Sequence, residues 1–252
     1  AVMKDSFKPM TTQQFSDTAH AVAEQIGGKI HVFNDWDTTD PDKNLGKAQP
    51  VITAQMEISE PLEIAGSKIE GKLILGVGFD GTRSFFMGHV NEYLRCTNAF
   101  GHIVEDFRSR LTKNNMIRIE EIIKKISTYR EYEQILYKNF QKFQEVKVDE
   151  NLIQECVARI VGLTNEERAM SKTEFMENVS TQKLNKMDDI LCSIRSEMAE
   201  LGDNAWALFN GVTHYSSHIM KSRGSSELST MFGAKNEVNQ TAYKLCLEVA
   251  NS

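Results

Sequence analysis

The sequence predicts an α+β fold: an N-terminal helix, a small antiparallel β-sheet, a long helix and then a largely helical C-terminal half. Three observations predict this class. Between residues 50 and 94, apolar residues form short runs bounded by turn-forming residues, as in β-strands. The pair Asp80-Gly81 separates two of those runs, as in a hairpin. From residue 116 onward, apolar residues recur every three or four positions, as on the buried face of a helix.

The first 50 residues predict one helix, one short strand and a loop. Residues 11–26 place their apolar side chains on one helical face, between a Thr-Thr start and a Gly27-Gly28 stop. Residues 29–33 predict a strand. The polar stretch that follows carries four aspartates, but it lacks the central glycine and the terminal glutamate of a calcium-binding loop. We therefore interpret it as a solvated loop.

The next stretch predicts three strands, over residues 50–58, 72–79 and 82–94. If Asp80-Gly81 forms a two-residue turn, Leu75 lies opposite Phe86. In that register, the apolar residues that share the core-facing side of the hairpin are Leu73, Leu75, Val77, Phe79 and Phe86.

The second face of this hairpin has two interpretations. It carries Gly76 and Gly78, which leave it bare, next to Arg83 and Phe85. A nucleic-acid strand could approach such a face, with Phe85 as a platform on which a base stacks. Alternatively, a helix covers the face, and the two glycines allow it to pack closely.

After Asn98 the sequence predicts only helices. The first covers residues 100–113, and a longer one covers residues 116–145. Shorter helices follow over residues 149–161, 172–201, 203–221 and 234–250. The helix over residues 172–201 is expected to be interrupted near Val179-Ser180. We divide the chain into an α+β region, residues 1–146, and a helical region, residues 147–252, which can also form one continuous domain.

Composition and charge indicate a soluble protein of a reducing cytoplasm. The four cysteines are scattered singly, with no Cys-x-x-Cys pair, which argues against a disulfide framework and against a structural zinc site. No apolar run is long enough to span a membrane. The formal net charge is −6, yet residues 83–142 hold 11 Lys/Arg against 7 Asp/Glu. A basic middle in an acidic chain is compatible with one groove for an anionic ligand.

Two histidines four residues apart, His214 and His218, raise the question of a metal or catalytic site. They share a helical face, but a His-Glu-x-x-His zinc site requires a glutamate between them, where this chain has Tyr215, Ser216 and Ser217. We interpret the pair as helix-edge histidines and expect no metal ion and no cofactor. The chain also lacks a P-loop, a Gly-x-Ser-x-Gly nucleophile elbow and a helix-opening Gly-x-Gly-x-x-Gly loop.

Several motifs follow one another in a distinctive order. An Asp-Gly turn precedes an Arg-x-Cys-x-Asn segment, a Trp-x-x-x-Asn-x-x-Thr helix start with a trailing histidine, and a Gly-Ala pair. These motif residues are Asp80, Gly81, Arg95, Cys96, Asn98, Trp206, Asn210, Thr213, His218, Gly233 and Ala234. The series resembles, over roughly residues 50–250, the phage and plasmid family called domain of unknown function 932. That family often has an acidic residue where this chain has His214, and a histidine where it has Arg108 or Arg110.

The resemblance implies a mobile-element origin and a prokaryotic cytoplasm. The order of elements is also similar to that of phage single-strand annealing proteins of the Red-beta, Erf and Sak type, which implies a homo-oligomer that binds single-stranded DNA without nucleotide hydrolysis. We therefore expect a non-enzymatic phage or plasmid DNA-metabolism protein that promotes annealing and recombination. The residues expected to contact nucleic acid are Lys72, Arg83, Phe85, Arg95, Arg108, Arg110 and Lys113.

Two other classes of function remain open. One is a module that binds a host or phage protein through the acidic C-terminal helical half. The other is a metal-dependent enzyme that uses His89, His102, His214 or His218.

Overall fold

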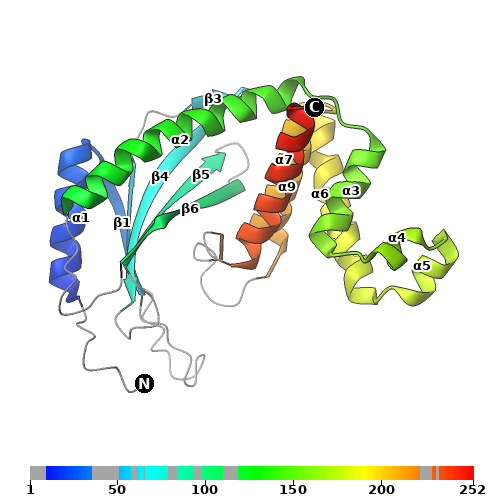
Figure 1. Cartoon of the computed structure of the whole chain (residues 1–252), viewed down its shortest axis with the longest axis horizontal. Coiled ribbons are helices and arrows are strands. Elements are labelled where there is room, and N and C mark those ends of the chain that lie inside the picture. The colour runs from blue at the N-terminus through cyan, green and yellow to red at the C-terminus, as the bar shows by residue number, and fades with distance from the viewer. Residues whose placement is uncertain are drawn as a thin grey trace, which may run out of the picture. The chain divides into compact units, whose positions relative to one another are not determined.

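The computed structural model of the chain describes residues 10–35, 51–57, 62–64, 66–78, 85–93, 98–109, 119–221, 229–230 and 233–252. These residues form one six-stranded β-sheet and a set of helices that occupy most of the C-terminal half (Figure 1). This α+β architecture confirms the predicted fold class. No helix in the described part of the chain combines the length and the apolar character needed to cross a membrane.

The sheet has the strand order β1-β2-β4-β5-β6, and β3 pairs with β4 outside this path. Its strands are β1 (Lys29–Asp35), β2 (Val51–Glu57), β3 (Leu62–Ile64), β4 (Ser67–Gly78), β5 (Phe85–Tyr93) and β6 (Asn98–Ser109). β1 and β4 both run antiparallel to β2. In the β2–β4 pair, Val51 lies opposite Gly78 and Glu57 lies opposite Lys72.

The helices largely follow the predicted pattern, since their starts and stops are encoded locally. They are α1 (Thr12–Ile26), α2 (Ile119–Glu145), α3 (Glu150–Val161), α4 (Asn165–Ala169), α5 (Lys172–Asn178), α6 (Thr181–Leu201), α7 (Ala205–His214), the π-helical turn η1 (Tyr215–Ile219) and α9 (Ala234–Ala250). The predicted interruption near Val179-Ser180 is confirmed, because the Ser180 side chain caps the start of α6. α4 was not expected from the sequence.

The helix predicted over residues 100–113 is wrong, because residues 98–109 form strand β6. The segment is rich in β-branched and aromatic residues, among them Ile103, Val104 and Phe107, which suit a strand as well as a short amphipathic helix. Periodicity alone cannot separate these two states over so short a stretch. In the structure this segment is hydrogen-bonded to β5 and forms the edge strand of the sheet, and this pairing stabilises the extended conformation.

The described chain divides into two compact units. Unit 1 comprises residues 1–62, 69–92 and 101–134, and unit 2 comprises residues 63–68, 93–100 and 135–252. The division therefore runs through α2 and through the ends of several strands, whereas the sequence suggested a boundary after residue 146. Each unit has its own core.

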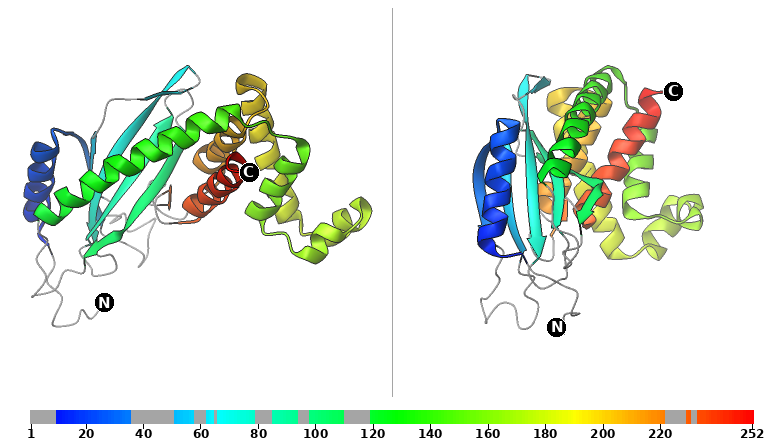
Figure 2. Two further views of the ribbon diagram at one scale, coloured as in Figure 1. Left: turned by 45° about the horizontal axis from the view of Figure 1, so that its top comes forward. Right: turned by 60° about the vertical axis from the view of Figure 1, so that its left-hand side comes forward.

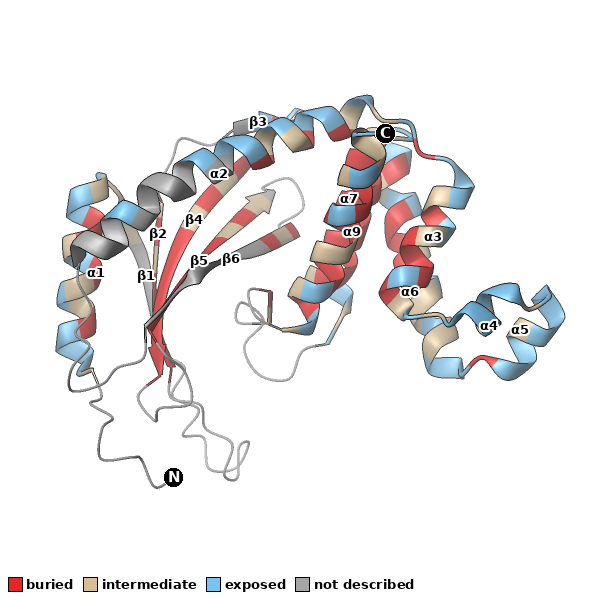
Figure 3. Cartoon of the chain, in the orientation of Figure 1, coloured by how far each residue is buried: buried red, intermediate tan, exposed pale blue. Residues whose placement is uncertain are grey.

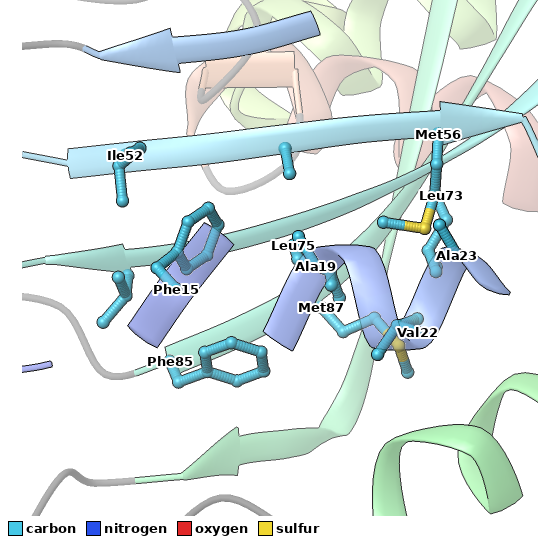
Figure 4. Packing of buried hydrophobic residues seen from close by; sticks show 12 residues of the cluster. Phe15, Ala19, Val22, Ala23, Ile52, Met56, Leu73, Leu75, Phe85 and Met87 are labelled. Carbon is cyan, nitrogen blue, oxygen red and sulfur yellow. The ribbon is translucent and has the colours of Figure 1, made fainter. Parts of the chain in front are cut away.

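The core of unit 1 forms where α1 lies on the sheet. Thr11 caps α1 in a capping box with Gln14, and Gly27 ends the helix in the left-handed conformation with φ of 66°. The apolar stripe of α1 then packs on strands β2, β4 and β5 (Figure 4). The buried side chains of this core are Phe15, Ala19, Val22, Ala23, Ile52, Ala54, Met56, Leu73, Leu75, Val77, Phe85 and Met87.

The register predicted for the β4–β5 hairpin is wrong by an odd number of residues. Leu75 shares the α1-facing core with Phe85 and Met87, whereas Phe86 lies against Gly76 on the opposite face. Because side chains alternate along a strand, an odd slip exchanges the two faces of β5. The residues of the turn itself, 79–84, lie outside the described part of the chain.

Both faces of the sheet are buried at β4. α1 covers one face, and the first half of α2 runs across the sheet on the other side (Figure 2). On that second face the ring of Phe86 occupies the space that a side chain at Gly76 would fill, since an added Cβ would lie 2.6 Å from the Cε1 atom of Phe86. This glycine therefore accommodates an aromatic ring from the neighbouring strand. Of the two interpretations of a bare face, close packing is the one that the structure supports.

Unit 2 is built around an aromatic cluster. Six rings, with neighbouring centroids 5.0–6.4 Å apart, come from the start of β6, the second half of α2, α7 and α9: Phe100, Phe140, Phe143, Trp206, Phe209 and Tyr243. α3 and α6 add buried apolar stripes of their own, whereas neither α4 nor α5 has a single buried residue (Figure 3). The buried Gly211 of α7 brings that helix against the backbone of Ile194 in α6.

Candidate functional site

Phe85 does not offer a stacking surface for a base. Its side chain is fully buried, and its ring centroid lies 6.5 Å from that of Phe15 in α1. Base stacking requires an accessible ring face, which α1 here covers. The structure therefore places Phe85 among the core residues of unit 1.

Lys72 is the other predicted contact whose side chain the structure describes. Its Nζ lies 2.5 Å from Glu92 Oε2 and 3.8 Å from Glu70 Oε2, and the side chain is about a quarter exposed. Two carboxylates beside one ammonium group leave little net positive charge for a phosphate. Lys72 is thus engaged in an ion-pair cluster on the sheet.

The other five residues predicted to contact nucleic acid have side chains outside the described part of the structure, so only their positions in the sequence can be compared. Arg108 lies in β6, and Arg83, Arg95, Arg110 and Lys113 lie outside the described residues. Antiparallel neighbours run in opposite directions. The first residues of β5 therefore lie beside the last residues of β4, and the last residues of β6 lie at the same end of the sheet. We call it the basic end. Of the five, only Arg108 lies in a described strand, near the end of β6; in the sequence Arg83 precedes β5, Arg95 follows β5, and Arg110 and Lys113 follow β6.

The sequence stretches that precede or follow the elements at the basic end hold more Lys/Arg than Asp/Glu. α1 starts at this end, since Phe15 meets Phe85, the first residue of β5, and β1 finishes where β2 begins. The stretches that precede or connect these elements, residues 1–9, 36–50, 79–84 and 110–118, hold eight Lys/Arg against five Asp/Glu. In a chain with a formal net charge of −6, these stretches of sequence thus have a surplus of positive charge.

A second candidate site surrounds the His214–His218 pair, where the sequence did not reveal the polar network that the structure shows. α7 ends at His214 and is followed without a break by the π-helical turn η1, after which the Met220 backbone N–H donates to Tyr215 O over 2.8 Å. π-helical turns interrupt regular helices at a cost and occur frequently at functional sites. This turn carries His218 and, with the end of α7, forms one side of a buried polar network.

Asn98, at the start of β6, joins that network to the sheet strand. Its side-chain Nδ2 donates to Asn210 O over 3.2 Å, and its Oδ1 lies 3.2 Å from Nε2 of His218. The next backbone N–H, from Ala99, donates to Ser217 Oγ over 3.0 Å. One short segment of β6 is therefore held by three residues of α7 and η1.

α9 closes the network from the other side. The fully buried Asn239 donates from Nδ2 to Ala99 O over 3.1 Å and accepts from Ser216 Oγ over 2.7 Å. Lys235, also buried, donates from Nζ to Ser217 O over 3.3 Å, and burial lowers the pKa of its ammonium group. Three segments far apart in the sequence thus meet around η1.

The two histidines lie side by side within this network. The ring centroids of His214 and His218 are 5.0 Å apart, with an angle of 43° between the ring planes. His218 is exposed and His214 is partly buried. Burial, together with the neighbouring His218, lowers the pKa of His214, so its imidazole is neutral at neutral pH.

Other residues that could perform chemistry are less suited to it. His89 is fully buried in β5, where its Nδ1 lies 3.2 Å from Asn91 Nδ2. The side chain of His102 lies outside the described residues. Burial raises the pKa of Cys156 to about 12, so this thiol stays protonated and unreactive. Within the described residues, no group of three His, Cys, Asp or Glu side chains is placed to hold a metal ion.

The fold and this network define an α+β protein in which several motif residues meet in one polar cluster. The chain belongs to the family described as Domain of unknown function (DUF932), whose model matches residues 36–244. No curated protein and no solved structure matches the chain. The motif residues quoted from the sequence include Asn98, Asn210, Thr213 and His218, and the structure links them by hydrogen bonds within one unit. Their spacing was the signal for the site, although it did not reveal that they meet.

Proposed function

We propose that the protein binds single-stranded nucleic acid, and promotes annealing of complementary strands, through the basic end of its sheet. The observation that carries this proposal is the contrast between the positive connections at that end and the acidic chain as a whole. A local positive field attracts a polyanion even when the net charge of the protein is negative. Phe85 is buried and Lys72 is paired with two carboxylates, so binding takes place at the end of the sheet and not on its face.

The test is the fluorescence anisotropy of a labelled oligonucleotide, single-stranded or duplex, titrated with protein at several salt concentrations. A triple variant replaces Arg83, Arg110 and Lys113 by alanine. Because each lost contact to a single-strand phosphate removes about 0.7 from the slope of log K against log salt, the triple variant should lose about 2. Mixing two complementary labelled strands with the protein then measures annealing.

A control of equal charge change replaces three exposed cations of unit 2: Lys172, Arg195 and Lys244. This control should bind the oligonucleotide as the wild type does. The proposal is wrong if the wild type binds neither nucleic acid at low salt, or if the two triple variants weaken binding equally. A homo-oligomer, the form expected of an annealing protein, is checked by light scattering of the same samples.

A second candidate function, the binding of a partner protein, is favoured by helices α4 and α5. Neither has a buried residue, and Met176 in α5 is 60% exposed. Both helices are nevertheless well capped, with capping boxes at Thr164 and Ser171. A preformed helical pair with an exposed methionine suits a protein surface. The wild type should then retain a host or phage protein in a pull-down that a Met176→Lys variant does not.

A further inference from the structure

We propose that helices α4 and α5 form a flap that detaches from the rest of unit 2 as one piece, and that two ion pairs hold it closed. The flap comprises residues 164–179, from the cap of α4 to the residue that ends α5. This conformational switch depends neither on nucleic-acid binding nor on a partner protein. Three features carry the inference: how little of the flap is buried, the joints at its two ends and the charges that attach it.

The flap contributes almost nothing to the core of unit 2. α4 and α5 contain no buried residue, and neither packs closely along another helix or strand of the described chain. Val179 is the only buried residue of the flap, all of which the structure describes. Helices this short are marginal on their own, but capping boxes at Thr164 and Ser171 stabilise both of them locally. The flap can therefore move while the core stays packed.

Extended residues provide a joint at each end of the flap. Thr164 leads into α4 with φ of −70° and ψ of 165°, and Val179 ends α5 with φ of −81° and ψ of 136°. α3 has already ended at Gly162, and α6 begins only after its cap, Ser180. No helix therefore runs from unit 2 into the flap. Residues at the ends of elements are the ones that absorb changes of φ and ψ in hinge motions.

Two neighbouring residues of α4 attach the flap through ion pairs. Lys183 of α6 donates from Nζ to both carboxylate oxygens of Glu167 over 2.7 Å. Arg168 donates from Nη1 to Glu155 Oε2 of α3 over 2.8 Å. The other oxygen of Glu155 accepts from Arg159 Nε over 2.7 Å, so this carboxylate is held in place on α3. The flap is thus tied to α6 by its own carboxylate and to α3 by its own guanidinium group.

Ion pairs in such positions give only a modest preference for the closed state. The side chains of Arg168 and Glu155 are about a third exposed, and those of Lys183 and Glu167 are 30% and 18% exposed. A pair that solvent reaches shifts an equilibrium by a factor of about 5 or less, and salt screens it. Two pairs then favour closure by about 25-fold at most. Salt, or the loss of one pair, should therefore raise the population of the open flap measurably.

The test is hydrogen–deuterium exchange of the full chain, followed by mass spectrometry at low salt and at about 0.5 M NaCl. Amides of the flap should exchange before those of α3 and α6, and high salt should accelerate the flap alone, by about 5- to 25-fold. Glu167→Gln removes the charge but keeps the capping box, and should accelerate the flap about fivefold at low salt. The matched control is Glu174→Gln, the same change at the same helix position of α5, where the carboxylate bonds to Ser171 within the flap. It should leave exchange unchanged.

A double-mutant cycle separates the ion pair from other effects of each change. Lys183→Gln should accelerate the flap as Glu167→Gln does, and the double variant should exchange no faster than either single variant. Trypsin gives an independent reading, since cleavage after Lys172 in α5 should be faster in Glu167→Gln than in Glu174→Gln. Circular dichroism confirms that each variant is folded. The proposal is overturned if Glu167→Gln exchanges like the wild type, if Glu174→Gln accelerates the flap equally, or if α3 and α6 exchange together with it.

Discussion

Gly211→Ala tests the close contact between α7 and α6. A Cβ atom added at Gly211 would lie 2.8 Å from the backbone N of Ile194 and 3.0 Å from its Cγ1, and closer still to its Cα. Unstrained carbon contacts are about 3.5–4.0 Å long. Since two of the three crowded atoms belong to the backbone, a change of rotamer cannot relieve the contact. The helices must separate instead.

Two opposing effects determine the magnitude. Alanine favours the helical state over glycine by about 1 kcal/mol, which by itself would stabilise α7. Overpacking of a well-packed core costs about 1–3 kcal/mol, and a displaced backbone belongs at the upper end of that range. We therefore expect Gly211→Ala to lower the free energy of unfolding by about 2 kcal/mol.

Urea unfolding followed by tryptophan fluorescence measures this change, because the buried Trp206 lies in α7 itself. Gly162→Ala is the control in the same unit: Gly162 has φ of 72° and no neighbour within 4 Å of an added Cβ. It should cost about 1–2 kcal/mol from backbone strain alone. Shortening the side chain of Ile194 should not rescue Gly211→Ala. If Gly211→Ala is as stable as the wild type or more so, the two helices do not pack as closely as the structure indicates.

Three further predictions concern the sheet, the polar network and the histidine pair. Gly76→Ala should destabilise unit 1, but the added Phe86→Leu change should restore part of the loss in a urea double-mutant cycle, because here the obstacle is the end of a side chain. Asn239→Ala should lower the free energy of unfolding by about 2 kcal/mol in urea, since buried hydrogen-bonding groups lose their partner. The lowered pKa of His214 means that its contribution to stability is complete above the ordinary value of 6.5 and is lost as the pH falls below it. His214→Gln should therefore flatten the decline of Tm between pH 7 and pH 5, and an unchanged decline would contradict this assignment.

Local sequence signals predicted most helices well. The helix expected over residues 11–26 is α1, Thr12–Ile26, and the last expected helix has the bounds of α9. Caps and glycine stops act within a few residues of the chain, so they can be recognised without knowledge of the fold. The Ser180 cap that divides α5 from α6 is such a signal.

The errors lie where contacts between distant segments decide the outcome. Phe85 and Phe86 are adjacent, and their faces depend on a register that the Asp-Gly pair alone does not determine. The segment that forms β6 satisfies a helical pattern as well as a strand pattern, and only an available partner strand makes it a strand. Neither choice could be made from nearby residues.

The sequence by itself thus determined the α+β class, the amphipathic helices and the family, because these depend on periodicity, capping and motif order. Only the tertiary structure decided that Phe85 is buried under α1 and that Asn98 lies beside His218, 120 residues further along the chain. The reason is physical. Local propensities act over one or two turns of chain, whereas a site such as this network exists only when distant segments satisfy one another's buried hydrogen-bonding groups.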